Sequence, residues 1–228
     1  YMNEWSQKDF FENSIKLEEA LPQYPEKIAN IRKNKKIKLA FLSSDIRNNH
    51  SITGFLKTVV ANVNKNKFEL ILFSNCKINK EDKTSKDFQN FFDEWINISS
   101  LNDIEAISEI RKYSIDIIID LMGLSSSNRI ALFKNRLAST QILWLGYNNT
   151  SGLKEMDYLM VDPNLIEKNE AKFYSEKLLF LPSIWNCHSG FINSRKDTSP
   201  PLIKNKYITF GSFNNINKIS DETIDVWS

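Results

Sequence analysis

Ile37-Lys38-Leu39-Ala40-Phe41-Leu42-Ser43 is the stretch of sequence that decides the fold. It is almost continuously apolar, whereas a strand with one face in water alternates apolar and polar residues. A run of this kind is typical of a strand covered on both faces, as in parallel sheets flanked by helices. A second such run, Ile115 to Leu121, is rich in β-branched isoleucine, which favours strands. Both runs predict an α/β protein.

Helix and strand patterns alternate outward from these two runs. Further strands are predicted at 68–74, 94–98, 141–145, 158–161 and 177–181, and helices at 51–63, 83–92, 101–113 and 129–133. This alternation predicts an open, doubly wound parallel sheet of the Rossmann-like type. None of the six glycines forms a GxGxxG pattern, so the usual dinucleotide-binding fingerprint is absent from the sequence.

The first 35 residues form a separate segment in this prediction. Their apolar residues recur at roughly helical spacing, and Pro22 and Pro25 interrupt the pattern, which predicts two helices joined by a turn. We therefore treat residues 1–35 as a helical linker that precedes the α/β domain.

The other end of the chain contains a predicted domain boundary. The polar segment Asn193 to Asn205 separates a domain at 36–195 from a linker and the start of a second domain at 196–228. In that second part, Tyr207 to Phe213 has the composition of a buried strand, and Ser220 precedes two acidic residues as a helix N-cap does. Because the chain starts at Tyr1 and stops inside this predicted helix, we expect it to be a fragment.

The charge balance and the cysteine content limit which binding partners and which cellular compartment are expected for this chain. The 30 Lys and Arg residues nearly balance the 28 Asp and Glu residues, so neither a nucleic acid nor an anionic membrane is predicted as the main partner. No apolar run approaches the roughly 20 residues of a membrane span. Cys76 and Cys187 lack the spacing of a metal site or a disulfide framework, so no metal is predicted and a reducing cytoplasm is the expected location.

Several short motifs occur in a fixed order along the chain. They are Ser43-Ser44-Asp45-Ile46-Arg47 with His50; Trp144-Leu145-Gly146-Tyr147 with Thr150-Ser151-Gly152 and Met156-Asp157-Tyr158; Tyr174-Ser175-Glu176-Lys177-Leu178; and Phe213-Asn214-Asn215-Ile216-Asn217-Lys218-Ile219. Together they resemble the motifs of the O-linked N-acetylglucosamine transferases and their SPINDLY-like relatives. The resemblance runs from about Lys36 to the last residue. It implies the N-terminal catalytic lobe of a GT-B glycosyltransferase, with the first elements of the C-terminal lobe, and it makes 1–35 the end of a tetratricopeptide-repeat array or its linker.

Three residues are candidates for catalytic roles. His50 follows the first strand, at the edge where open α/β sheets bind ligands, and the resemblance places the matching histidine beside the donor sugar and the acceptor. Asp120 ends a buried strand, where a carboxylate could position an acceptor hydroxyl, although an ordinary capping acid is an equal alternative. Lys218 lies between a predicted strand and a helix N-terminus, a common setting for an anion. The resemblance implies that this lysine neutralises the leaving diphosphate, whereas the alternative is an ordinary surface lysine.

Three more residues are candidates for contacts to the donor or substrate. The resemblance places Asn215 beside the nucleotide and Ser125 in a segment near the sugar, where Met122 stands in place of a polar residue. Thr150, in a turn built by Asn148-Asn149, is expected to be mainly architectural and is a candidate for ligand contact.

The resemblance also implies an activity. It is the transfer of a sugar, N-acetylglucosamine from UDP-N-acetylglucosamine, to serine or threonine hydroxyls of acceptor proteins, with inversion and without a metal or another cofactor. GDP-fucose and UDP-glucose remain alternative donors, and a non-catalytic binding module on a helical-repeat scaffold is an alternative of another class. The fragment by itself is expected to be inactive.

Overall fold

The computed structural model describes residues 5–24, 36–188, 190, 199–216 and 219–228 of the 228-residue chain. The chain divides into two compact units, one spanning Gln7–Gly190 and the other comprising residues 1–6 and 191–228. Each unit is described by itself.

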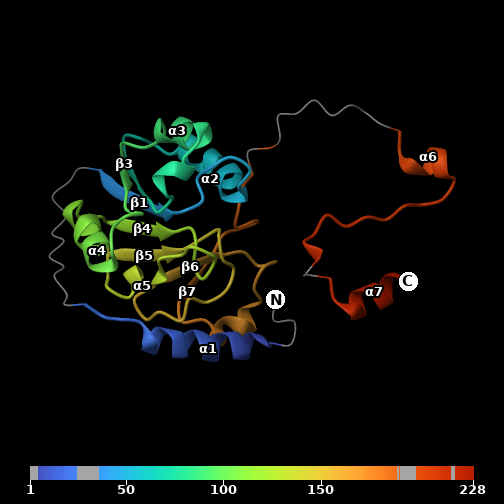
Figure 1. Ribbon diagram of the computed structural model, residues 1–228. Coiled ribbons are helices and arrows are strands. Elements are labelled where there is room, and N and C mark those ends of the chain that lie inside the picture. Colours follow the sequence, from blue (N-terminus) through green and yellow to red (C-terminus); the bar gives the residue numbers. More distant parts are fainter. Residues whose placement is uncertain (1–4, 25–35, 189, 191–198, 217–218) are drawn as a thin grey trace. The chain divides into compact units, whose positions relative to one another are not determined.

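The larger unit is built on a seven-stranded sheet in which every neighbouring pair is parallel (Figure 1). Its strands are β1 (Ile37–Ser43), β2 (Phe68–Ser74), β3 (Glu94–Asn97), β4 (Ile117–Asp120), β5 (Thr140–Leu143), β6 (Tyr158–Val161) and β7 (Lys177–Phe180). Their spatial order is β3-β2-β1-β4-β5-β6-β7. The prediction of a doubly wound parallel sheet is therefore confirmed.

Helices cover both faces of this sheet. They are α2 (Ser51–Asn62), α3 (Lys83–Gln89), α4 (Asp103–Lys112) and α5 (Ile130–Phe133), with 3-10 helices η1 (Ile78–Lys80) and η2 (Lys168–Phe173). Successive residues of β1 point to opposite faces: Phe41 belongs to one hydrophobic cluster with α2 and α3, and Leu42 to another with α4 and α5. This explains why the sequence of β1 is apolar without alternation.

The connections of β1 and β4 define a ligand-binding edge. From β1 the chain continues through α2 to β2 on one side, whereas the connection through α4 brings it back to β4 on the other side of β1. The loops that follow β1 and β4 therefore start next to each other at the carboxyl edge of the sheet and lead to helices on opposite faces, α2 and α5. In open α/β sheets the crevice at such a reversal of strand order is the usual binding site.

Helix α1 (Gln7–Ala20) packs as part of the sheet unit and runs beside η2 (Figure 1). The Lys134 ammonium closes its C-terminal end, because Nζ lies 2.6 Å from the Glu18 carbonyl and 2.9 Å from the Leu21 carbonyl. The same ammonium pairs with the buried Glu18 carboxylate at 3.4 Å. The first helix predicted within 1–35 is confirmed, and the second lies in 25–35, outside the described residues.

The smaller unit contains α6 (Pro201–Asn205) and α7 (Asp221–Trp227). The helix start at Ser220 is confirmed, since its hydroxyl accepts a hydrogen bond from the Thr223 amide at 3.3 Å. The predicted strand at Tyr207–Phe213 is wrong: these residues form neither helix nor strand, and their aromatic side chains are exposed. A strand requires a neighbour to pair its backbone groups, and within the described residues no other segment pairs with this one.

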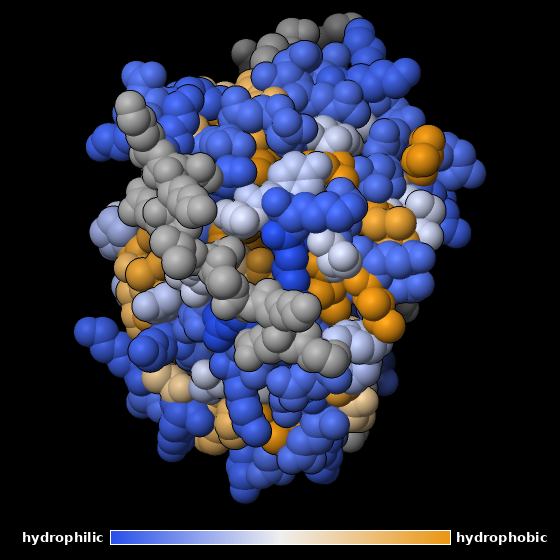
Figure 2. Space-filling model, turned by 90° about the vertical axis from the view of Figure 1, so that its left-hand side faces the viewer, coloured by the Kyte–Doolittle hydropathy of each residue, from blue (hydrophilic) through white to orange (hydrophobic). Residues whose placement is uncertain are grey.

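Hydrophilic side chains cover most of the face of the structure shown in Figure 2, and hydrophobic ones appear there in separate groups. This is the side of the sheet unit on which α4 lies in Figure 1. The apolar stripe of α4, Ala106, Ile107 and Ile110, is buried, which leaves its charged residues for the surface. None of the helices that the structure describes is long and apolar enough to span a bilayer.

Candidate active site

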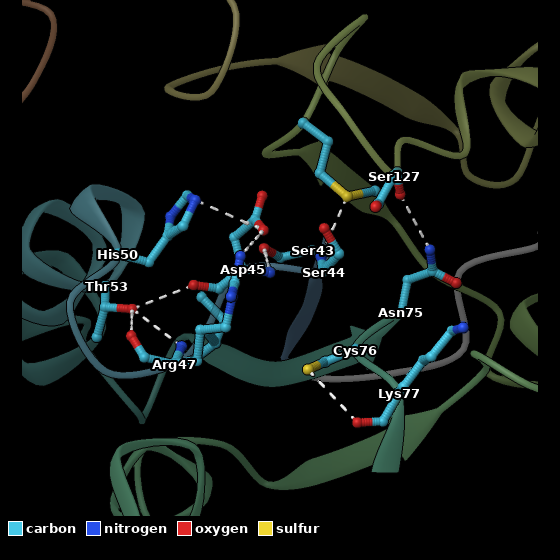
Figure 3. Close-up of polar contacts among 12 residues, drawn as sticks. Ser43, Ser44, Asp45, Arg47, His50, Thr53, Asn75, Cys76, Lys77 and Ser127 are labelled. Atoms are coloured by element: carbon cyan, nitrogen blue, oxygen red, sulfur yellow. Dashed lines mark hydrogen bonds and ion pairs between the residues drawn. The ribbon is translucent and has the colours of Figure 1, made fainter. Parts of the chain in front are cut away.

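The loops after β1 and β4 meet at the carboxyl edge of the sheet. The register pairs Leu42 of β1 with Asp120 of β4, so that residues 44–50 and 121–129 leave the sheet side by side. A hydrogen bond joins the two loops, because the Met122 sulfur accepts from the Ser44 amide at 3.1 Å (Figure 3). The crevice predicted from the strand order is therefore built by these two loops.

A single threonine hydroxyl organises the loop after β1. Thr53, in the first turn of α2, places its Oγ1 2.9 Å from the Arg47 carbonyl and 3.2 Å from the Asp45 carbonyl, and it accepts from the Arg47 amide at 3.2 Å. The Ser43 hydroxyl accepts from the Asp45 amide at 3.0 Å. Asn49 completes the loop in a left-handed conformation with φ of 58°, which asparagine adopts more readily than most residues.

His50 stands at the N-terminus of α2, facing Asp45 (Figure 3). Its Nε2 lies 3.6 Å from the Asp45 carboxylate, and its side chain is 31% exposed, so a ligand in the crevice can reach it. Its Nδ1 is buried and has no hydrogen-bond partner among the described residues. The same carboxylate lies 3.6 Å from the Arg47 guanidinium, which balances its charge.

A cleft of about 320 Å³ opens beside this histidine. Its walls come from the ends of β1 and β5, the first turn of α2 and the loop after β4: Asp45, Arg47, His50, Ser51, Ile52, Ser125, Ser126, Ser127, Leu145 and Gly146. Two of the residues predicted from the sequence, His50 and Ser125, thus line one cleft. A polar cleft with a histidine, a carboxylate and several hydroxyls can hold a hydroxyl-bearing substrate and accept its proton.

Asp120 is not among the residues that line this cleft. The residue is buried, and its carboxylate accepts hydrogen bonds from the amides of Met122 and Gly123, each at 3.0 Å. Burial raises the pKa of Asp120 to about 7, and these two backbone N–H groups oppose the rise. Of the two predicted roles, the structure gives Asp120 that of the capping acid, because its oxygens are used within its own loop.

Thr150 and Met122 are also placed in the interior. Thr150 is fully buried, and its hydroxyl donates to the Glu176 carboxylate at 2.8 Å while the Gly152 and Ser175 amides donate to it. Its side chain is therefore not available to a ligand, in contrast to the predicted contact. Met122 is fully buried as well, so it does not face the crevice as its place in the motif implied.

The two remaining predicted residues belong to the smaller unit. Asn215 is exposed and lies in an irregular segment that precedes α7. Lys218 lies outside the described residues. Their roles beside a nucleotide stay predictions.

Two residues of the crevice were missed by the site prediction. Asp45 orients His50, and Thr53 fixes the loop that carries both. The signal for Asp45 was present, since it sits in the Ser43–Arg47 motif directly after an apolar strand. No local pattern marks Thr53, whose role depends on how α2 folds back over the loop. Within the described residues, no group of three His, Cys, Asp or Glu side chains comes together as metal ligands.

Comparison with known proteins identifies the family. The sequence model of glycosyl transferase family 41 matches residues 11–228. The chain belongs to glycosyl transferase family 41. Family 41 membership agrees with the resemblance that the motifs carry.

Curated relatives and a solved structure support the family 41 assignment. The chain is 27% identical over 182 residues to a probable UDP-N-acetylglucosamine–peptide N-acetylglucosaminyltransferase SPINDLY of Solanum lycopersicum, which covers 78% of this chain and 19% of that protein. It is 24% identical over 207 residues to the probable UDP-N-acetylglucosamine–peptide N-acetylglucosaminyltransferase SEC of Arabidopsis thaliana. That alignment covers 85% of this chain and 20% of the relative. An O-GlcNAc transferase variant of Thermobaculum terrenum superposes with a TM-score of 0.73 at 23% identity, over 81% of this chain and 36% of that one, which shows a shared fold. The chain spans about a fifth of the length of these curated relatives.

Proposed function

We propose that this chain is the N-terminal catalytic lobe, with the beginning of the C-terminal lobe, of a protein O-glycosyltransferase. The observation that carries the proposal is the His50 cleft at the carboxyl edge of a doubly wound sheet, in a chain that family 41 matches over residues 11–228. The names of its relatives supply the donor, UDP-N-acetylglucosamine, and a peptide acceptor. Serine or threonine hydroxyls are the groups that such a transfer modifies.

The reaction is a single displacement at the anomeric carbon of the sugar. The acceptor oxygen attacks this carbon, the bond from the carbon to the diphosphate oxygen breaks, and the nucleoside diphosphate leaves with the electron pair. Attack from the face opposite the leaving group inverts the configuration. The acceptor proton goes to a base in the cleft, and no metal or other cofactor takes part in this scheme.

His50 is the candidate for this base. Its Nε2 faces the Asp45 carboxylate at 3.6 Å in the cleft, whereas Nδ1 is buried, so Nε2 is the nitrogen that accepts the proton of the acceptor hydroxyl. A carboxylate beside a catalytic imidazole orients the ring and stabilises its positive charge. Asp45 is therefore the positioning residue in this scheme, and Ser125, on the facing wall, is a candidate contact to the substrate.

Lys218 and Asn215 are proposed to act on the other reaction partner. A cation near the leaving diphosphate stabilises the charge that grows as the sugar bond breaks, and electrostatic stabilisation of this kind is often the largest catalytic contribution. This assignment rests on the motif around Lys218 and on the helix N-terminus at Ser220. A cytoplasmic location is part of the same proposal, and Cys76 and Cys187 are both free thiols.

A donor panel tests the proposal. The natural protein that contains this chain is incubated with serine peptides and, in separate reactions, with UDP-N-acetylglucosamine, UDP-glucose or GDP-fucose, and the peptides are weighed by mass spectrometry. We expect the mass of one N-acetylhexosamine to be added with the first donor. Addition of glucose or fucose instead would replace the donor assignment. No transfer from any of the three donors would favour the alternative of a non-catalytic binding module.

A further inference from the structure

A second cleft, of about 360 Å³, lies on the other side of Asp45 and Arg47 from His50. It is lined by the ends of β1, β2 and β3, by η1, by the start of α4 and by the loop after β4: Ser44, Asp45, Arg47, Asn75, Cys76, Lys77, Lys80, Ser99, Leu101, Asp103, Ser127, Asn128 and Arg129. Figure 3 shows Asn75, Cys76 and Lys77 across Ser44 and Asp45 from His50. The proposed reaction uses none of the residues that belong to this cleft alone.

Cations outnumber acids in the lining of this second cleft. Four side chains, those of Arg47, Lys77, Lys80 and Arg129, are cationic, and the carboxylates are those of Asp45 and Asp103. The Arg129 guanidinium is held by Asp103 at 2.7 Å and by the Asn75 amide oxygen at 3.1 Å, and Arg47 faces Asp45. These pairs balance one another and fix the walls of the cleft.

The two lysines carry the charge that remains. Lys77 directly precedes η1 and Lys80 is its last residue. Both lysines are exposed, and within the described residues neither has a carboxylate at ion-pair distance. Glu81, the next residue, directs its Oε1 to the Asn97 amide at 2.9 Å and the Ser74 hydroxyl at 3.3 Å. The lining therefore has a net positive charge, with four cationic side chains against two carboxylates.

An unpartnered buried hydroxyl is a second, independent indication of a ligand. Ser44 is 7% exposed and lines the cleft, and its Oγ has no hydrogen-bond partner among the described residues. A buried hydroxyl without a partner costs free energy, so such groups in native proteins usually meet a ligand or a water molecule. An oxyanion held in the cleft provides the acceptor that this hydroxyl lacks.

We infer that the cleft between Ser44, Lys77 and Lys80 is an anion subsite for the acceptor polypeptide, and that it takes a carboxylate or phosphate side chain close to the hydroxyl that is glycosylated. The subsite shares Asp45, Arg47 and Ser127 with the His50 cleft, so one extended polypeptide can occupy both. Its lining includes no aromatic ring, and Leu101 is its main apolar side chain, so it offers no platform for a nucleobase. An acidic side chain fits this lining better than a nucleotide does. The inference deepens the proposed function, on which its assignment to the acceptor rests.

Peptide binding without any donor sugar tests the subsite. Fluorescent serine peptides that differ only at one flanking position, which is Gln, Glu or phosphoserine, are titrated with the natural protein that contains this chain. At one flanking position, we expect the Glu and phosphoserine peptides to bind at least about fivefold more tightly than the Gln peptide, because hydrogen bonds to a charged group are stronger than those to a neutral amide. If phosphate is the natural ligand, the peptide with the doubly charged phosphoserine should bind more tightly than the Glu peptide. If a carboxylate is the natural ligand, the two peptides should bind with equal affinity.

Two variants separate the subsite from general electrostatics. Lys77→Gln/Lys80→Gln should abolish the preference for acidic peptides, whereas Lys83→Gln/Lys86→Gln, which removes the same charge from exposed positions of α3, should keep it. Ser44→Ala should weaken the binding of acidic peptides without lowering the stability of the protein, because the hydroxyl that it removes has no hydrogen-bond partner among the described residues.

Equal affinity for Gln and acidic peptides at every position would overturn the subsite. An equal loss of the preference for acidic peptides in the two double variants would overturn it as well. Displacement of the acidic peptide by UDP from the Lys77/Lys80 site would overturn its assignment to the acceptor. The binding titration measures no sugar transfer, so its outcome is independent of the donor panel. A protein that binds acidic peptides through these lysines but glycosylates no peptide in the donor panel would refute the proposed function and leave the anion subsite in place.

Discussion

Asp120 illustrates how a buried carboxylate can be used to shape a loop at a candidate site. Its two oxygens hold the amides of Met122 and Gly123, and Met122 in turn holds the Ser44 amide of the facing loop. The carboxylate therefore supports the walls of the crevice without lining the His50 cleft.

The raised pKa of Asp120 predicts a pH dependence of stability. Because burial raises this pKa to about 7, the folded protein keeps a proton that the unfolded chain releases near its ordinary value of about 4. The contribution of Asp120 to the free energy of unfolding is therefore fully present below about pH 4 and is lost as the pH rises through about 7. Urea unfolding between these pH values should show this decline in the wild type and not in Asp120→Asn. The same slope in both proteins would assign the decline to other groups.

Lys218 is predicted to act on turnover. An interaction that is stronger in the transition state than in the ground state lowers kcat when it is lost, whereas one that is equal in both raises only KM. Lys218→Ala in the natural protein should reduce kcat by roughly a hundredfold or more, the scale of a lost preorganised stabilising group. Lys218→Arg should restore little, because a planar fork does not reproduce a compact ammonium. A near-normal kcat in the alanine variant would make Lys218 an ordinary surface residue.

Among the elements, α1 is fixed to the sheet unit at Gly152. This glycine has φ of 79°, and a Cβ placed on it would lie 2.3 Å from the Ser14 carbonyl oxygen of α1. Glu176 holds the same turn from the other side, since its carboxylate accepts from Thr150 and Ser151. The turn is thus clamped between α1 and the segment that leads into β7.

Gly152→Ala should therefore lower the free energy of unfolding by more than backbone strain alone would. A left-handed conformation costs a non-glycine residue roughly 1 to 2 kcal/mol, and displacement of α1 adds to that cost. Gly190→Ala is the matched control, because Gly190 has φ of 80° and nothing within 4 Å of an added Cβ. Denaturant unfolding should show the larger loss for Gly152→Ala. Equal losses would mean that α1 adapts to the methyl group without cost.

The elements of the sheet unit could largely be predicted from the sequence, since buried strands and amphipathic helices leave local patterns. The bounds of β1, β2 and β6 agree with the prediction. The pattern failed at Tyr207–Phe213, because composition alone does not tell whether a neighbouring strand is present. For the candidate site, His50 and Ser125 could be placed at a strand edge, whereas the burial of Thr150 depends on Glu176, which is distant in sequence.

For the whole molecule, we predict that the chain by itself does not transfer sugar. It covers 36% of the solved transferase with which it shares a fold, and the proposed donor contacts Asn215 and Lys218 lie in its smaller unit. Incubation of the isolated chain with UDP-N-acetylglucosamine and an acceptor peptide should give no product above background, while the natural protein gives product under the same conditions. Robust turnover by the isolated chain would refute this prediction.

The central claim is that the His50 cleft is where the acceptor hydroxyl reacts, and steady-state kinetics of the natural protein carrying His50→Ala test it most directly. Loss of a positioned general base typically costs about 10² to 10⁴ in rate, so kcat for peptide glycosylation should fall at least about a hundredfold. The control is Asn49→Gly, one residue earlier, where glycine suits the φ of 58° and catalysis should be unchanged. A His50→Ala enzyme with kcat within about threefold of the wild type, against the loss expected of a general base, would contradict the account.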